Sequence, residues 1–230
     1  SALRQQADTS NVTLWPAANF SVVRLPIPLV TARMHASLSS GARSCSHSKT
    51  EMFTEEGLVA MAFTAYMPTV EPAGGTKPFY GTNPMSFAWP RKNGLPMVFD
   101  QASAAMAKGE VMLAERDGHN LPAGVGITHD GKPTTDPSEV LKGCILPFGG
   151  YKGASIALMI ELLVGPLIGE MSSVEAGKRH GSTGGPPQGG ELVIAFDPEK
   201  FGNRNGWADD GESLFESLLS IEGTRLPGAR

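Results

Sequence analysis

A chain of 230 residues is long enough to bury a sizeable hydrophobic core, as one domain or as two modest ones. Its hydrophobic content of 40%, charged content of 18% and formal net charge of -4 are those of an ordinary soluble globular protein. The acidic balance offers no basic surface to nucleic acid, and no stretch reaches the ~18 apolar residues of a membrane span. We therefore expect no nucleic-acid partner, no membrane partner and a cytoplasmic location.

Regular secondary-structure patterns begin near residue 55. Upstream, residues 11–49 keep neither a helical nor a strand period for long, and the Ser- and Arg-rich run HASLSSGARSCSHSK has the composition of a flexible or disordered segment. Downstream, the patterns predict strands over 58–67, 85–90, 96–100 and 191–198, helices over 103–118, from 151 onward and over 212–223, and a Gly/Pro-rich loop over 171–190. Strands mixed with helices indicate an α/β or α+β-like fold. The change in pattern divides the chain into a divergent N-terminal segment, 1–50, and a core domain, 51–230.

A glycine turn before an apolar helix is the strongest local feature. Phe148 is followed by Gly149, Gly150, Tyr151, Lys152 and Gly153. A helix N-terminus offers unpaired N–H groups and the positive end of the helix dipole, and Lys152 adds a formal charge. The pattern is typical of a phosphate or carboxylate site, with an ordinary loop and a solvated lysine as the alternative.

No Gly-x-Gly-x-x-Gly fingerprint follows a strand, so a bound nucleotide would not be held in the Rossmann manner. Asp100, at the end of a predicted strand, could bond a ribose or cap the next helix, and capping is the commoner use. Gly109 lies inside a predicted helix, where glycine costs about 1 kcal/mol relative to alanine. Either close approach of a substrate or helix packing would explain it. Glu110 could orient a catalytic base, or be a solvated glutamate.

The five histidines show no metal-ligand spacing with one another or with cysteine, so the sequence predicts no metal site.

Five motifs in a fixed order carry a resemblance to a known family. They are KPFYGTNPMSFAWPR, FDQASAAMAKGE, PTTDP, LPFGGYKGASIALMIELL and GGPPQGGELVIAFDP. Together they resemble the malate/L-lactate dehydrogenase-like oxidoreductases, nearest to the branch of the Δ1-piperideine-2-carboxylate/Δ1-pyrroline-2-carboxylate reductases. The resemblance extends from Glu55 to about Arg225. It implies a non-Rossmann NAD(P)-binding mixed-sheet fold and a homodimer.

The resemblance also implies roles for individual residues. Glu110 falls where the imine reductases carry the acidic member of a charge relay, which favours that branch over malate-type relatives. The residues expected to contact the small-molecule substrate are Thr82, Lys108 and Gly109. Those expected to contact the cofactor are Asp100, Gln101, Ala102, Tyr151, Lys152, Asp197, Pro198, Glu199, Lys200, Phe201, Gly202 and Asn203.

The expected activity is reduction of cyclic imino acids with NADPH, or alternatively with NADH. Two family motifs are not matched: a Ser-His-Gly motif with its proton-donating histidine, and an Asn-Ser-His-His-Phe cofactor motif. We therefore expect an N-terminally truncated member whose catalysis is weak or lost. Two alternatives stay open, an NAD(P)-dependent malate/L-lactate (2-hydroxyacid) dehydrogenase and a non-catalytic binding protein on an enzyme scaffold.

Overall fold

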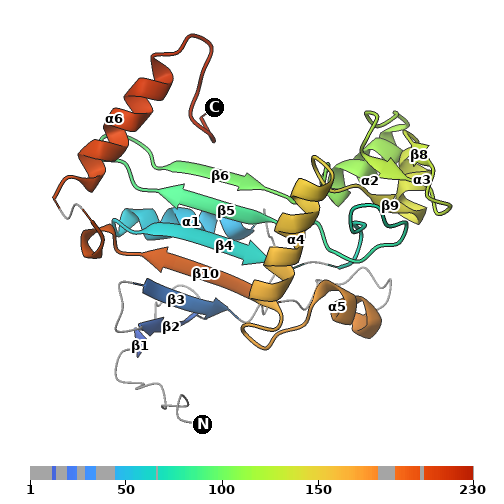
Figure 1. The fold of residues 1–230 in the computed structure, drawn as a ribbon, viewed down its shortest axis with the longest axis horizontal. Coiled ribbons are helices and arrows are strands. Elements are labelled where there is room, and N and C mark those ends of the chain that lie inside the picture. Colours follow the sequence, from blue (N-terminus) through green and yellow to red (C-terminus); the bar gives the residue numbers. More distant parts are fainter. Residues whose placement is uncertain are drawn as a thin grey trace.

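A seven-stranded open sheet organises the part of the chain that the computed structural model describes, which is residues 12–13, 20–24, 29–34, 45–65, 67–180, 190–202 and 205–229 (Figure 1). Its strand order is β1-β2-β3-β10-β4-β5-β6, and every neighbouring pair is antiparallel. The strands are β1 (Val12–Thr13), β2 (Phe20–Arg24), β3 (Leu29–Met34), β4 (Val59–Thr64), β5 (Met85–Trp89), β6 (Met97–Gln101) and β10 (Glu191–Phe196).

Helices and a small second sheet complete the fold. The second sheet has the order β8-β7-β9, formed by β7 (Gly126–Ile127), β8 (Pro133–Thr134) and β9 (Cys144–Ile145). The helices are α1 (Cys45–Glu55), α2 (Lys108–Asp117), α3 (Pro137–Lys142), α4 (Tyr151–Val164), α5 (Ser173–His180) and α6 (Trp207–Leu219), with a 3-10 turn, η2 (Pro198–Lys200).

The two faces of the large sheet are covered by different helices. On one face lies α1, whose buried Thr50 hydroxyl is 3.1 Å from that of Ser86 on β5. Side chains alternate along a strand, so Phe63 and Leu192 point to the opposite face. There they pack against Ile160 and Val164 of α4. The same face carries the half-buried side chains of Met61 and Phe87, which are register partners on β4 and β5.

A second hydrophobic cluster joins α4 to the lobe that contains α2 and the small sheet. Val111 and Ala114 of α2 pack with Ala154 and Ala157 of α4. This cluster connects the lobe that contains α2 to the N-terminal half of α4 (Figure 1).

The predicted strands of the core and the helices beginning near 151 and 212 are confirmed, with boundaries shifted by a few residues. The helix expected over 103–118 begins only at Lys108. The N–H groups of Ser103 and Ala105 donate to the carbonyls of Thr82 and Leu146, so these residues extend a strand-like pairing instead of starting the helix. Gly118 ends α2 in the left-handed conformation, as expected.

Two segments are more regular than their patterns predict. The expected loop over 171–190 contains α5, whose start is a capping box: Glu175 accepts hydrogen bonds from the Ser172 N–H and hydroxyl, and the Ser172 hydroxyl accepts from the Glu175 N–H. The described portions of residues 11–49 form strands that extend the large sheet and the start of α1.

Candidate cofactor and substrate site

Three loops meet at the end of the large sheet where β5 begins and β6 ends. Ser103 donates from its N–H and its hydroxyl to the carbonyl of Thr82, at 2.9 and 3.0 Å. The N–H of Phe148 in turn donates to the carbonyl of Ser103, at 3.0 Å. The predicted substrate residue Thr82 and the predicted cofactor residues Gln101 and Ala102 are therefore brought to the glycine turn that starts α4.

The N-terminus of α4 is exposed at this meeting point. Gly150 is its N-cap residue and provides no side-chain cap, while Tyr151 is 71% exposed and Lys152 is also exposed. The amides of Lys152 and Gly153 donate to the carbonyls of Gly149 and Phe148. Among the described residues, the Tyr151 amide has no hydrogen-bond partner. The expected set of unpaired N–H groups is thus reduced to that of Tyr151, beside the Lys152 ammonium group.

Gly153 packs α4 against the other two loops. A Cβ at this position would lie 2.6 Å from the backbone N and O of Phe148 and from the O of Ser103. Real Cβ atoms essentially never approach so closely, and backbone atoms cannot swing aside. This glycine therefore allows close approach of the protein's own backbone.

The start of α2 presents Lys108, Gly109 and Glu110 to solvent. The N-cap of α2 is Ala107, so the expectation that Asp100 caps this helix is wrong. Asp100 lies within β6 opposite Ser86, on the face of α1, and Gln101 points to the other face. A Cβ at Gly109 would meet no described atom within 4 Å, which excludes helix packing in the described part of the chain as its explanation.

The other predicted cofactor segment lies at the opposite end of the sheet. Residues 197–202 follow Phe196, the last residue of β10, whose register partner on β4 is Val59. Gln101 and Thr82 lie at the end where β10 begins, and six residues of strand separate the two ends by roughly 17 Å. Asp197 accepts from the Glu199 N–H at 3.1 Å and so caps η2. Asn203 lies outside the described residues.

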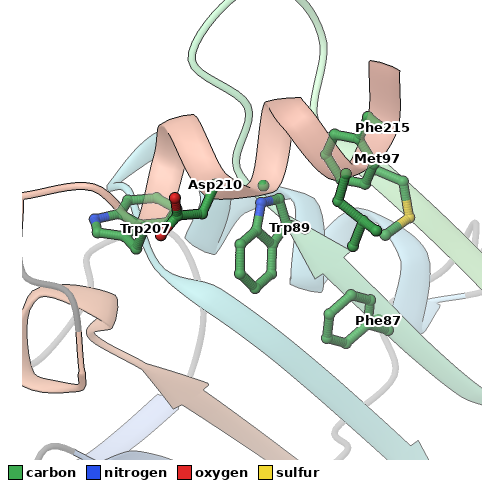
Figure 2. A pocket seen from close by; sticks show the side chains of 8 residues that line it. Phe87, Trp89, Met97, Trp207, Asp210 and Phe215 are labelled. Atoms are coloured by element: carbon green, nitrogen blue, oxygen red, sulfur yellow. The ribbon is translucent and has the colours of Figure 1, made fainter. Parts of the chain in front are cut away.

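Two apolar cavities lie at this end of the sheet, and the smaller one is lined in part by this segment. One, of about 270 Å³, is lined by Val59, Trp89, Phe196, Pro198, Phe201, Gly202 and Trp207. The other, of about 510 Å³, lies between α6 and the sheet and is lined by Phe87, Trp89, Met97, Trp207, Asp210, Gly211, Leu214 and Phe215 (Figure 2). Trp89 and Trp207 line both cavities. Their rings pack edge to face, with the ring centres 5.7 Å apart. Sequence reasoning missed both tryptophans, because one is in a strand and the other begins a helix distant in sequence.

An ion pair holds α6 over the sheet at this end. The Arg91 guanidinium donates to both carboxylate oxygens of Glu212, at 3.1 and 2.6 Å, and its carbon lies 5.3 Å from the centre of the Phe215 ring. The hydrogen bond from Arg91 lowers the pKa of Glu212 and raises that of Arg91.

Within the described residues, no group of three or more His, Cys, Asp and Glu side chains is placed to hold a metal ion. None of the described helices is long and apolar enough to cross a membrane.

Comparison with known proteins identifies this architecture. The Δ1-pyrroline-2-carboxylate/Δ1-piperideine-2-carboxylate reductase of Pseudomonas aeruginosa is 43% identical over 213 residues, which cover 90% of this chain and 64% of that protein. The Δ1-pyrroline-2-carboxylate reductase of Ancylobacter novellus is 46% identical over 182 residues, covering 78% and 53% respectively. The solved structure of Δ1-piperideine-2-carboxylate reductase from Pseudomonas syringae superposes with a TM-score of 0.74 at 40% identity, over 79% of this chain and 55% of that one.

The similar proteins are oxidoreductases, and the expected α/β class is the one their structures share. The profile of the malate/L-lactate dehydrogenase family matches residues 34–230. The chain belongs to this family, as its motifs predicted, and it spans between 53% and 64% of the length of these relatives.

Proposed function

We propose that the protein takes part in NADPH-dependent reduction of the cyclic imino acids Δ1-pyrroline-2-carboxylate and Δ1-piperideine-2-carboxylate. One observation carries the proposal: hydrogen bonds through Ser103 bring together Thr82, the end of β6 and the loop that starts α4. The names of the similar reductases support the substrate class.

The residues present fit an anionic dinucleotide and a small carboxylate. When bound, the cofactor supplies a hydride for the imine carbon. The unpaired Tyr151 N–H, the Lys152 ammonium and the dipole of α4 would attract a phosphate group. Thr82 and the exposed Lys108 would hold the substrate carboxylate, and the open space beside Gly109 would admit it. Glu110 would stabilise a protonated base.

The segment 197–202 would bind the other end of the same cofactor. Its cavity of about 270 Å³ is lined by flat aromatic and apolar side chains, which suits a nucleobase. Between the two ends lies the face of the sheet that carries α4, where Met61 and Phe87 are half-buried register partners. An extended dinucleotide along this face would touch both segments. We further propose residues 51–230 as the cofactor-binding core, a homodimer and a cytoplasmic location.

Titration of the chain with NADPH and with NADH, followed by protein fluorescence, tests the cofactor site. We expect NADPH to bind more tightly than NADH. Lys152→Ala should weaken NADPH binding by about ten-fold, because it removes a charge-assisted contact to phosphate. Lys132→Ala removes the same charge from an exposed turn and is the matched control. Failure of both cofactors to bind would refute the proposal.

A substrate panel tests the reaction. NADPH consumption should be faster with Δ1-pyrroline-2-carboxylate and Δ1-piperideine-2-carboxylate than with pyruvate or oxaloacetate. The opposite order would favour a 2-hydroxyacid dehydrogenase. Cofactor binding without turnover of any of them would favour a binding protein.

A further inference from the structure

A closed ring of buried polar groups lies beneath Thr82. Asn83 is fully buried, and its side-chain amide donates to the carbonyl of Ala157 at 3.2 Å and to a carboxylate oxygen of Glu161 at 2.8 Å. The other carboxylate oxygen of Glu161 accepts from the Ser173 N–H, at 2.8 Å. The carboxylate therefore joins the loop before β5 to the first residue of α5.

Ser173 completes the ring on the other side of Thr82. Its hydroxyl accepts from the Gly81 N–H at 3.0 Å and lies 3.4 Å from the side-chain oxygen of Asn83, to which it donates. Both neighbours of Thr82 are thus held by side chains of α4 and α5. The carbonyl of Thr82 is held by Ser103.

The side-chain hydroxyl of Thr82 is left to act. Within the described part of the chain it makes no hydrogen bond, and the residue is half-buried between buried neighbours. Asn83 has a φ of 42°, the only positive φ of a non-glycine residue among those described. Such a conformation is retained where the surroundings over-determine it, and it is concentrated at functional sites.

The chemistry of the ring also argues against simple packing. Glu161 is 6% exposed and Ser173 is fully buried, and a buried carboxylate is costly unless it is hydrogen-bonded. An apolar side chain of similar volume would fill the same space without that cost. A carboxylate that accepts from two different segments instead fixes their relative position.

We propose that Glu161 and Ser173 are positioning residues, which hold the loop 81–83 so that the Thr82 hydroxyl points to the carboxylate of the bound imino acid. This inference rests on the proposed function. Neither residue touches the ligand; each acts through the backbone of the loop.

Hydrogen–deuterium exchange of the 230-residue chain tests the positioning directly. In Glu161→Gln an amide group replaces one acceptor and faces a donor, so the ring breaks without a change in size. We expect faster exchange in the peptides that contain 81–83 and the start of α5, with exchange elsewhere unchanged. Glu222→Gln removes the same charge from an exposed turn and should leave exchange as in the unmodified chain. Unchanged exchange at 81–83 would overturn the proposal, as would a uniform increase over the whole chain.

Binding of pyrrole-2-carboxylate in the presence of NADPH tests the consequence. Glu161→Gln should weaken the binding of pyrrole-2-carboxylate by about ten-fold. The affinity for NADPH should stay unchanged, because only the loop 81–83 is released. Ser173→Ala, which keeps the bond between Glu161 and Asn83, should give a smaller loss of the same kind. If Glu161→Gln does not fold, Ser173→Ala becomes the test. The proposal would be overturned if that variant showed the same exchange at 81–83 and the same affinity for pyrrole-2-carboxylate as the unmodified chain. If the unmodified chain does not bind pyrrole-2-carboxylate, the proposed function fails, and the exchange result alone decides whether the loop is positioned by the ring.

Discussion

Replacing Gly153 by alanine would test whether α4 is packed as closely on the loops of Ser103 and Phe148 as the structure shows. The new Cβ would lie 2.6 Å from three backbone atoms, so α4 or both loops must shift. Overpacking of this kind costs up to about 3 kcal/mol. A glycine-to-alanine change in a helix regains at most about 1 kcal/mol. The net loss of roughly 2 kcal/mol corresponds to a melting temperature lower by about 4–8 °C for a chain of this size.

Gly109→Ala is the matched control, because both glycines lie in the first turn of a helix. Around Gly109 a Cβ meets nothing within 4 Å in the described part of the chain, so only the gain in helix propensity remains. We expect its melting temperature to rise by about 1–4 °C. Thermal unfolding followed by circular dichroism measures both variants. Equal stabilities would refute the close approach at Gly153. In ligand titrations, Gly153→Ala should lower the affinity for NADPH. Gly109→Ala should lower only the affinity for the carboxylate ligand.

Three further predictions concern single ionisable groups. Because Arg91 lowers the pKa of Glu212, this carboxylate contributes stability above its ordinary pKa of 4.5 and loses it as the pH falls through the lower folded value. At neutral pH the Glu212→Gln variant should therefore have a lower melting temperature than the unmodified chain. Its melting temperature should fall less on acidification, which thermal unfolding measured over a range of pH would show. Burial raises the pKa of the Cys144 thiol to about 11, with a smaller contribution from Glu71. In a Cys45→Ser background the native chain should not react with a thiol reagent at about pH 8, and its unfolding free energy should fall as the pH rises from about 9 toward about 11. Glu110→Gln should lower turnover by on the order of ten-fold, since the glutamate is exposed and screened, and leave NADPH affinity unchanged; unchanged turnover would contradict its assigned role.

The core strands and the long helix could be predicted because their signals are local. The run from Val59 to Thr64 is mostly apolar and lies just after Gly57, and the helix after Gly150 is 14 residues long and mostly apolar. The start of α2 could not be predicted from composition. Its expected first residues pair instead with Thr82 and Leu146, which are distant in sequence. Helix α5 was predictable, since Ser172 and Glu175 have the spacing of a capping box.

The buried ring around Asn83 could not be found from the sequence. Two of its hydrogen bonds join residues that are separated by 78 and by 90 positions in the sequence. Each of these residues looks ordinary in its own segment. Glu161 interrupts an apolar helix and Ser173 begins a short one. Neither pattern indicates which residue is the hydrogen-bond partner. In the motif Gly81-Thr82-Asn83-Pro84 the family resemblance implies a role for the threonine, whereas the side chain of the asparagine makes the buried hydrogen bonds of the ring.

The separation of the two predicted cofactor segments follows from strand direction, which the sequence does not contain. In an antiparallel sheet the ends of neighbouring strands alternate, so β10 ends where β4 begins and where β5 ends. The segment after Phe196 must then face Trp89 and Trp207, and the segment after Gln101 must face the start of α4. A compact ligand can occupy only one of these ends, because roughly 17 Å of strand lies between them. If one ligand uses both, as we propose, it is an extended molecule with an anionic group near Lys152 and a flat ring among the aromatic side chains, which describes a dinucleotide better than it describes any small organic acid.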